Sequence, residues 1–271
     1  MSILRRTLLF LLLACLALVA AFDIWGFATL GSLTPAQDPL RDPDANRVVM
    51  VFGASGSVGD GLLKAAMEDP RVQTIHVVTR STSPRIDAGA ATGRLQLHMH
   101  RDFTDYAPLA AVLGEVNTVL WALGTSSLNV DDASYTRIHV DFPVAFVRAW
   151  LARRTHGPMS FHNVTGMGTD PEGGQHWARE KGRAERELAQ LAAPTDLRTY
   201  SYRSAYIRPT RERAGALAYF GEMLLTPGYL VIPGRDLGRA MLEISARVDE
   251  LPNGTLIDNR DSIEYAAAYR Q

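Results

Sequence analysis

One stretch constrains the fold of this chain more than any other, an apolar run followed at once by glycines: VVMVFGASGSVGDGLLKAAM. The five apolar residues Val48–Phe52 show no polar alternation, which is typical of a parallel strand buried on both faces. Gly53, Gly56 and Gly59 follow in the spacing G-x-x-G-x-x-G, and apolar residues then recur with the period of a helix. We therefore predict a strand, a tight turn and a helix over residues 58–67.

A turn of this kind is suited to the pyrophosphate of a dinucleotide. Gly53 permits the sharp bend, Gly56 lets the backbone approach the pyrophosphate, and Gly59 lets helix and strand pack closely. The pyrophosphate then meets the free N–H groups at the positive end of the helix. A second strand, TIHVVTR, completes a β-α-β unit, which favours cofactor binding over a purely steric turn. The predicted contacts come from Gly53, Ser55, Gly56, Ser57, Val58 and Gly59.

The end of the second strand bears on the choice of nucleotide. Sites selective for NAD commonly place Asp or Glu there to hold the ribose 2′-hydroxyl. This chain has Thr79, Arg80 and Ser81 instead. Because a cation and hydroxyls suit a 2′-phosphate, we predict a preference for NADP(H) over NAD(H). The alternative for Arg80 is an ordinary surface arginine.

Strands and helices continue to alternate along the chain. Further strands are expected at LQLHM, VNTVLW, SFHNV, LRTYSYR and GTLIDN, and helices at 133–153, 176–191 and 234–245. This order predicts an α/β fold with a doubly wound parallel sheet, a Rossmann fold. Loops after the third and fourth strands would complete the cofactor site, through Asp102 and Phe103 beside the adenine and through Ala122, Leu123 and Gly124.

The chain resembles the short-chain dehydrogenase/reductase superfamily, most closely its atypical NAD(P)H-binding branch. The resemblance covers about residues 47–271 and depends on the order of GASGSVG, WALGTSS, NVTGMGTDP, WAREKGRAE, YRSAYIRPT and PGRDLGRAML. It implies an oxidoreductase with a nicotinamide dinucleotide cofactor.

The same resemblance implies a set of catalytic positions. In that family a Ser or Thr after the fifth strand polarises the substrate carbonyl, and a Tyr four residues before a Lys passes the proton. The hydroxyl corresponds to Thr165 and the lysine to Lys181, which also holds the nicotinamide ribose. The tyrosine position is Trp177, and an indole has no proton that titrates near neutral pH.

Three explanations for Trp177 remain open. Proton transfer has moved to another group, for which Tyr206, His162 and His176 are the candidates. Alternatively, the substrate needs little acid catalysis. As a third possibility, the chain is a catalytically silent NADP(H)-binding sensor or assembly protein. A nucleotide-sugar epimerase or dehydratase ranks last, because the related extended enzymes need the same tyrosine. We favour an NADP-dependent oxidoreductase.

The C-terminal part, from about residue 200, is expected to form a small substrate pocket. It is rich in tyrosine, leucine and methionine, which favours an apolar or aromatic carbonyl-type small molecule as substrate. Arg208, Arg211 and Arg213 would instead suit an anionic substrate, or simply face solvent. For the apolar residues 214–225, an alternative is that they lie against a membrane.

The N-terminal residues 1–31 form a separate apolar element. After Arg5 and Arg6 no charge occurs from Thr7 to Phe22, and the apolar character resumes after Asp23, long enough to cross a bilayer. This favours a retained membrane anchor over a cleaved signal peptide, which would lead to export. Residues 32–46 would be an extended tether, and 47–271 the Rossmann domain.

The membrane side stays open. Arg5 and Arg6 favour a cytoplasmic N-terminus, whereas Arg41 and Arg47 on the other flank weaken that inference. The oligomeric state is not indicated by any pattern.

Charge and cysteine content exclude several classes of function. The net charge of −1 provides no general field for nucleic acid, so no nucleic-acid partner is expected. Cys15 is the only cysteine, which excludes an internal disulfide and a cysteine zinc site. The seven histidines lack a metal-ligand spacing, so no metal site is predicted.

Overall fold

A seven-stranded parallel sheet lies at the centre of the computed structural model, which describes residues 3–154 and 156–269. Its order is β3-β2-β1-β4-β5-β6-β9, and every neighbouring pair is parallel. The strands are β1 Val48–Phe52, β2 Thr74–Thr79, β3 Leu95–Met99, β4 Thr118–Trp121, β5 Met159–Val164, β6 Leu197–Arg203 and β9 Thr255–Asp258. The order reverses between β1 and β4, so the predicted doubly wound sheet is confirmed.

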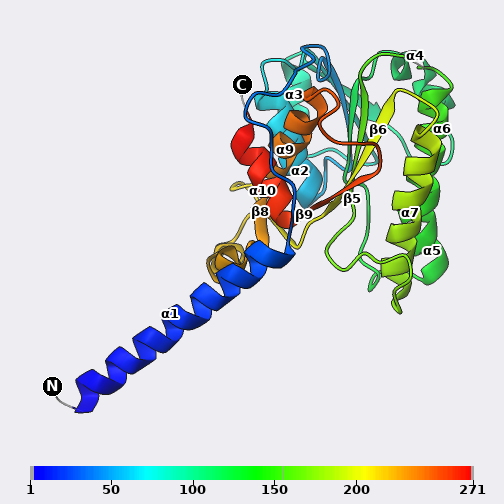
Figure 1. Cartoon of the computed structure of the whole chain (residues 1–271). Coiled ribbons are helices and arrows are strands. Elements are labelled where there is room, and N and C mark those ends of the chain that lie inside the picture. The colour runs from blue at the N-terminus through cyan, green and yellow to red at the C-terminus, as the bar shows by residue number, and fades with distance from the viewer. Residues whose placement is uncertain (1–2, 155, 270–271) are drawn as a thin grey trace.

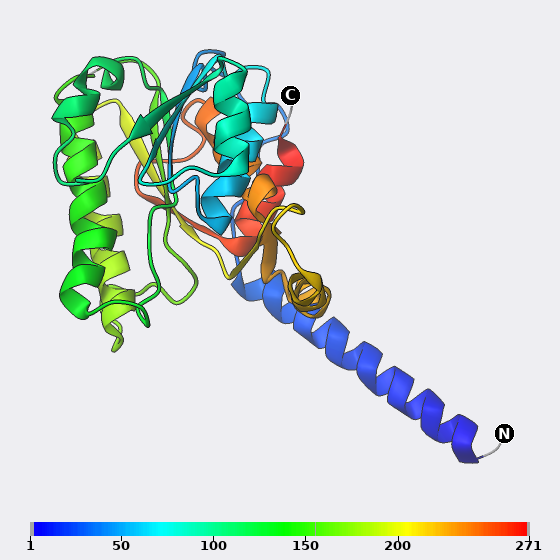
Figure 2. The same cartoon turned by 180° about the vertical axis from the view of Figure 1, so that it is seen from behind.

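Helices cover both faces of this sheet (Figures 1 and 2). One layer contains α2 Ser57–Glu68, α3 Pro84–Ala91, α9 Gly234–Ala246 and α10 Asn259–Ala268. The other contains α4 Ala110–Leu113, α5 Asp132–Thr136, α6 Phe142–Leu151 and α7 His176–Ala192. Along β1, Val49 and Val51 pack into the first layer while Met50 and Phe52 pack into the second. Burial on both sides explains why this strand shows no polar alternation.

The long helix predicted over residues 133–153 is interrupted. A π-helical turn, Arg137–Asp141, separates α5 from α6. Pro143 follows in the first turn of α6 and has no N–H to donate to the carbonyl four residues earlier. The wider turn accommodates that missing hydrogen bond, and such turns are frequent at functional sites.

A small lobe follows β6. It contains a parallel pair of short strands, β7 Tyr206–Arg208 and β8 Val231–Pro233, with α8 Ala216–Leu225 and the 3-10 turn Thr226–Gly228 between them. This lobe lies at the carboxyl end of the sheet, where the sequence predicts the substrate pocket.

The N-terminal helix α1, Ile3–Thr29, projects away from the domain (Figures 1 and 2). Its segment Thr7–Thr29 is the one helix, among the described residues, that is long and apolar enough to cross a membrane. This criterion concerns length and composition, and a signal sequence meets it too.

The predicted tether, residues 32–46, is extended but is not a free spacer. Arg41 Nη1 donates to Glu243 Oε2 at 3.0 Å, and the Asp42 amide donates to the Ala246 carbonyl at 2.9 Å. The buried Asn46 side chain donates to the Leu242 carbonyl at 2.7 Å. These contacts hold the segment against α9 and its C-terminal end as a strap.

Candidate functional site

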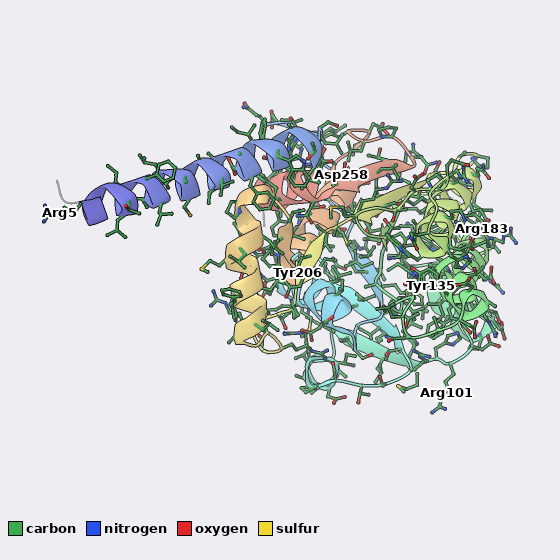
Figure 3. The ribbon with its side chains drawn as sticks, turned by 90° about the horizontal axis from the view of Figure 1, so that it is seen from below. Arg5, Arg101, Tyr135, Arg183, Tyr206 and Asp258 are labelled. Atoms are coloured by element: carbon green, nitrogen blue, oxygen red, sulfur yellow. The ribbon has the colours of Figure 1, made fainter. Side chains whose placement is uncertain are left out.

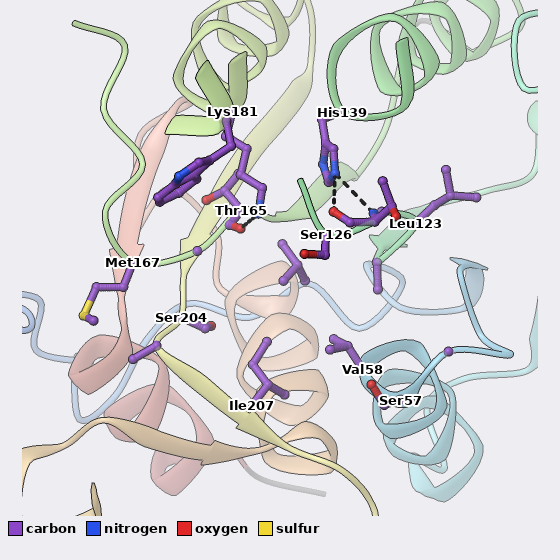
Figure 4. Close-up of a pocket in the computed structure, with 18 residues that line it drawn as sticks. Ser57, Val58, Leu123, Ser126, His139, Thr165, Met167, Lys181, Ser204 and Ile207 are labelled. Carbon is purple, nitrogen blue, oxygen red and sulfur yellow. Dashed lines mark hydrogen bonds between the residues drawn. The ribbon is translucent and has the colours of Figure 1, made fainter. Parts of the chain in front are cut away.

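A cavity of about 620 Å³ lies at the carboxyl ends of the central strands. The glycine turn, the loop after β4, the end of β5, α7 and the residues after β6 all contribute to its wall (Figure 4). Its lining includes Gly56, Ser57, Val58, Ala122, Leu123, Gly124, Thr125, Ser126, His139, Thr165, Met167, Trp177, Lys181, Ser204, Ala205 and Ile207. In open α/β sheets, ligands bind at this edge, where the strand order reverses.

The glycine turn has little room for side chains. Gly53 has a φ of +74°, and a Cβ there would lie 2.4 Å from the Ala122 carbonyl oxygen. At Gly59 a Cβ would lie 2.1 Å from the Gly53 carbonyl oxygen. The bend and the close helix packing predicted for these two glycines are therefore present. Gly56 faces the cavity and begins α2 without a side-chain cap, so the first N–H groups of the helix face a possible anion.

A second cavity of about 170 Å³ adjoins the first and shares Gly56, Ala122, Leu123 and Gly124 with it. Its remaining lining is Gly53, Ser55, Thr79, Arg80 and Ser81. The residues predicted to surround the adenosine ribose are thus brought together.

The wall beside this small cavity also involves Arg213, which the sequence did not single out as a cofactor ligand. Arg213 Nη1 donates to the Ser55 carbonyl at 2.9 Å, and its Nε lies 3.6 Å from Asp60 Oδ1. Asp60 is buried in the first turn of α2 and also pairs with Arg85 at 3.0 Å. The paired arginines compensate a carboxylate that would otherwise repel an anion at the helix start.

The structure places Asp102 and Phe103 outside the lining of both cavities. Phe103 is buried in the core against Phe52 and Phe142, and it lines neither cavity. Asp102 is exposed, and its Oδ1 accepts hydrogen bonds from the amide and hydroxyl of Thr104, which lower the pKa of the carboxyl. Phe103 thus packs in the aromatic core, and the contact of these two residues with an adenine stays a prediction.

Lys181 reaches the cavity from α7 (Figure 4). Its Nζ donates to the Thr165 carbonyl oxygen. Burial lowers the pKa of Lys181 to about 8, and the nearby Glu185 carboxylate opposes that shift. A lysine with such a pKa can give up a proton near neutral pH.

Thr165 is brought beside Lys181, but its hydroxyl faces elsewhere. Its Oγ1 donates towards Glu185 Oε1 at 2.9 Å and is 3.2 Å from the Tyr202 carbonyl oxygen. Arg203 also pairs with Glu185, at 2.7 Å. The Thr165 hydroxyl therefore donates its proton to the Glu185 carboxylate, which does not line the cavity. This disfavours the predicted contact of the hydroxyl with a substrate carbonyl.

Trp177 lines the cavity one helical turn before Lys181, as the resemblance implies for the tyrosine position. The proposed substitutes for that tyrosine do not reach the cavity. Ala205 and Ile207 line it, whereas Tyr206, between them on β7, does not, because successive side chains of a strand point to opposite faces.

The two histidine candidates also lie outside the cavity lining. His162 is fully buried between the Tyr202 hydroxyl at 2.8 Å and the Ser245 hydroxyl at 2.7 Å. His176 lies at the start of α7 with its Nε2 3.2 Å from the Asp132 carbonyl oxygen. The structure thus places neither where it could protonate a ligand in the cavity.

Several polar residues of the cavity were missed by the sequence reasoning, among them His139 and Ser204. His139, from the π-helical turn, has its Nε2 3.0 Å from the Thr125 carbonyl oxygen (Figure 4). Burial, together with the Lys181 charge, lowers the pKa of His139 to about 4. Ser204 is buried, and its Oγ has no hydrogen-bond partner among the described residues. The position of Ser204 directly after β6, at the carboxyl edge of the sheet, could have identified it as a site residue from the sequence.

Comparisons with known proteins support the fold. No family model and no curated protein matches the sequence. Among solved structures, a short chain dehydrogenase from Pseudomonas syringae is 18% identical with a TM-score of 0.60, over 82% of this chain and 98% of that one. A 3-oxoacyl-[acyl-carrier protein] reductase from Brucella melitensis in complex with NAD is 15% identical with a TM-score of 0.61, over 80% and 98%.

A longer neighbour is matched less completely. The UDP-glucuronic acid 4-epimerase from Bacillus cereus in complex with NAD is 13% identical with a TM-score of 0.55, over 73% of this chain and 72% of the epimerase. At these identities the likeness concerns the fold. The chain therefore has the fold of the short-chain dehydrogenases/reductases, with a helix, α1, in addition.

Proposed function

We propose that the chain binds NADP(H) in the two adjoining cavities and acts as an oxidoreductase on an apolar or aromatic carbonyl compound. The observation that supports this most is the uncapped start of α2 at Gly56, which faces the larger cavity beside the smaller one lined by Arg80. Solved neighbours of the same fold include a 3-oxoacyl-[acyl-carrier protein] reductase in complex with NAD.

The residues present fit such a cofactor. A Cβ added at Gly56 would lie 3.2 Å from the Gly53 carbonyl oxygen and would narrow the space at the turn. The unpartnered Ser204 Oγ offers a donor and an acceptor to a polar group such as the nicotinamide carboxamide. Gly53, Ser55, Ser57, Val58, Ala122, Leu123 and Gly124 would surround the pyrophosphate and riboses, and Arg80 the 2′-phosphate.

Lys181 is the group that we assign to proton transfer. A nicotinamide cofactor supplies hydride chemistry. The oxygen of a carbonyl that has accepted a hydride needs one proton, and the Lys181 ammonium, with a pKa near 8, can donate it. The amine then regains a proton from solvent. His139 is neutral at pH 7 and holds the loop after β4 through Thr125.

A second candidate function is favoured by two observations. Trp177 occupies the tyrosine position, and the Thr165 hydroxyl is committed to Glu185. These features suit a chain that binds NADP(H) without turnover, as a sensor.

A measurement of NADPH oxidation distinguishes the oxidoreductase from the sensor. The full chain, solubilised in detergent, is supplied with NADPH and a panel of aromatic ketones, aldehydes and quinones, and the absorbance of NADPH is followed. The oxidoreductase proposal expects substrate-dependent oxidation that Lys181→Met abolishes, and Trp177→Tyr accelerates because it restores a phenol one turn from Lys181. NADPH binding without oxidation in the wild type and without any gain in Trp177→Tyr would instead support the sensor.

A further inference from the structure

Exposed large apolar side chains are concentrated on α1 and α8. Helix α8 has no buried residue, although Glu222 is the only charged residue in ALAYFGEMLL. Leu217 is 82% exposed and Met223 64% exposed. The remaining exposed apolar side chains of this helix are Tyr219, Phe220 and Leu224. A patch of this kind on a domain surface marks an interaction site.

The apolar side chains of α8 share its outer face. Ala218, Glu222 and Leu225 recur at helical spacing and are half-buried on the side towards the domain. Glu222 pairs there with Arg208 at 2.8 Å, and the Arg208 guanidinium lies over the Tyr219 ring. The outward face therefore carries no charge.

Helix α8 is fixed to the C-terminal end of α1. Within the turn after α8, Gly228 is so close to α1 that a Cβ on Gly26 would lie 2.2 Å from its carbonyl oxygen. The Tyr229 ring lies 6.3 Å from the Phe27 ring. On the domain side, Arg260 Nη2 donates to the Gly31 carbonyl at 2.5 Å. The turn after α8 thus joins this helix to the C-terminal end of α1.

The position of α8 along α1 corresponds to the end of a membrane span. The 23 residues Thr7–Thr29 extend for about 34 Å as a helix, against an apolar bilayer thickness of ~30 Å. Phe22 and Gly26, which contact Gly228 in the turn after α8, lie near the end of that length. Figure 3 shows α8 crosswise to α1, on the side of the domain from which α1 projects.

We propose that α8 is an interfacial membrane helix, which docks the domain onto the surface of the bilayer that α1 enters. Leu217, Phe220 and Met223 would lie at the boundary of headgroups and acyl chains, in the manner of interfacial amphipathic helices. Trp25 and Tyr219 supply the aromatic side chains that are enriched at this depth. The exposed Arg211, just before α8, suits anionic headgroups.

Lipid fits this face better than a second copy or a soluble protein does. Helix α8 is joined to α1 by the turn Thr226–Gly228, and among the described residues of the segment Thr7–Thr29 Gly26 alone is buried. Only a bilayer covers both surfaces at once. This inference goes beyond the proposed function and does not depend on the cofactor.

Depth-dependent fluorescence tests the docking directly. In the full chain with Cys15→Ser, a single cysteine is introduced as Phe220→Cys or Met223→Cys and labelled with an environment-sensitive nitrobenzoxadiazole dye. The protein is reconstituted into vesicles of phosphatidylcholine and phosphatidylglycerol, with or without lipid spin-labelled high on the acyl chain. Leu16→Cys in α1 reports insertion, and Leu128→Cys, at a loop position that is 92% exposed, reports water.

The proposal expects blue-shifted emission from both α8 positions and the loss of most of it with spin-labelled lipid, while Leu128→Cys is unaffected. Quenching at Leu16→Cys with unquenched, water-like α8 labels would overturn it. Blue-shifted but unquenched α8 labels would overturn it too, because a protein surface then covers the helix. An absence of quenching at every position would refute both α1 insertion and α8 docking.

Discussion

At the residue scale, the three glycines of the turn serve two purposes: two of them allow close backbone packing, and one leaves space towards the cavity. Gly53 and Gly59 are each required by a backbone carbonyl that leaves no space for a Cβ. Gly56 meets only one atom at 3.2 Å, so its side-chain-free surface is mainly towards the cavity. These roles were predictable from the sequence. The spacing of the glycines after the strand determines which of them packs against backbone and which faces the cavity.

Gly59→Ala is therefore expected to destabilise the domain. The added Cβ overlaps the Gly53 carbonyl, and overpacking of this kind costs about 1–3 kcal/mol. Gly221→Ala is the matched control, because a Cβ at this helical glycine meets no atom within 4 Å and should raise helix stability by up to ~1 kcal/mol. Denaturant unfolding measures both, and equal stability of Gly59→Ala and wild type would contradict the tight turn.

The lowered pKa of Lys181 predicts that the stability of the folded chain depends on pH. Its pKa is about 8 in the folded chain and 10.5 ordinarily, so between these values the unfolded chain binds more protons. Stability should then rise with pH across this window by on the order of 2 kcal/mol. Unfolding at pH 7.5 and pH 10 should show this rise in wild type and not in Lys181→Met. A rise of the same size in the variant would assign it to other groups.

Other residues of the site were beyond prediction from the sequence. The direction of the Thr165 hydroxyl depends on Glu185, a helical turn beyond Lys181, and on Arg203 from the next strand. Arg213 reaches the glycine turn from the C-terminal lobe, across 158 residues of sequence. Such placements depend on tertiary packing, which local periodicity does not contain.

At the element scale, the seven strands of the main sheet were all predictable, and the departures have local causes. Pro143 interrupts the long helix between α5 and α6 and so turns His139 into the cavity. Helix α8 was predictable only as an apolar segment, because a helix without a buried face lacks the usual alternation of apolar and polar positions.

The strap over residues 32–46 should contribute to stability through Arg41. Arg41→Ala removes the charged hydrogen bond to the buried Glu243, and the expected loss is about 1.5–3 kcal/mol. Arg47→Ala, directly after the strap, is the control, since its exposed pair with Asp44 at 3.6 Å should contribute less than ~1 kcal/mol. Chemical unfolding and amide exchange of the strap test this, and equal effects of the two substitutions would refute the role of Arg41.

At the scale of the whole molecule, two apolar cores lie on either side of the sheet, and buried ionisable groups lie in them or beside them. His162 is one of them, fully buried between Tyr202 and Ser245. The order of strands and helices predicted the two layers. The order of elements did not predict that α8 is joined to α1, because the contact between them is made by the turn at Gly228.

Burial of His162 predicts loss of stability in mild acid. Burial lowers its pKa to about 3, so the folded chain keeps it neutral while the unfolded chain binds a proton below about 6.5. Its contribution is complete above pH 6.5 and decreases by ~2 kcal/mol by pH 5. His162→Gln should flatten this slope, whereas the exposed His156→Gln should not. An unchanged slope in His162→Gln would contradict the prediction.

Cofactor binding is the central claim, and a titration of the full chain with NADPH and NADH tests it most directly. Arg80 beside the smaller cavity predicts that NADPH binds about tenfold more tightly than NADH or better, equivalent to ~1.4 kcal/mol. Arg80→Ala should remove this preference, and Arg148→Ala, an exposed arginine on α6, should keep it. Binding of neither nucleotide would mean that the glycine turn serves the fold alone, and the proposed function would be wrong.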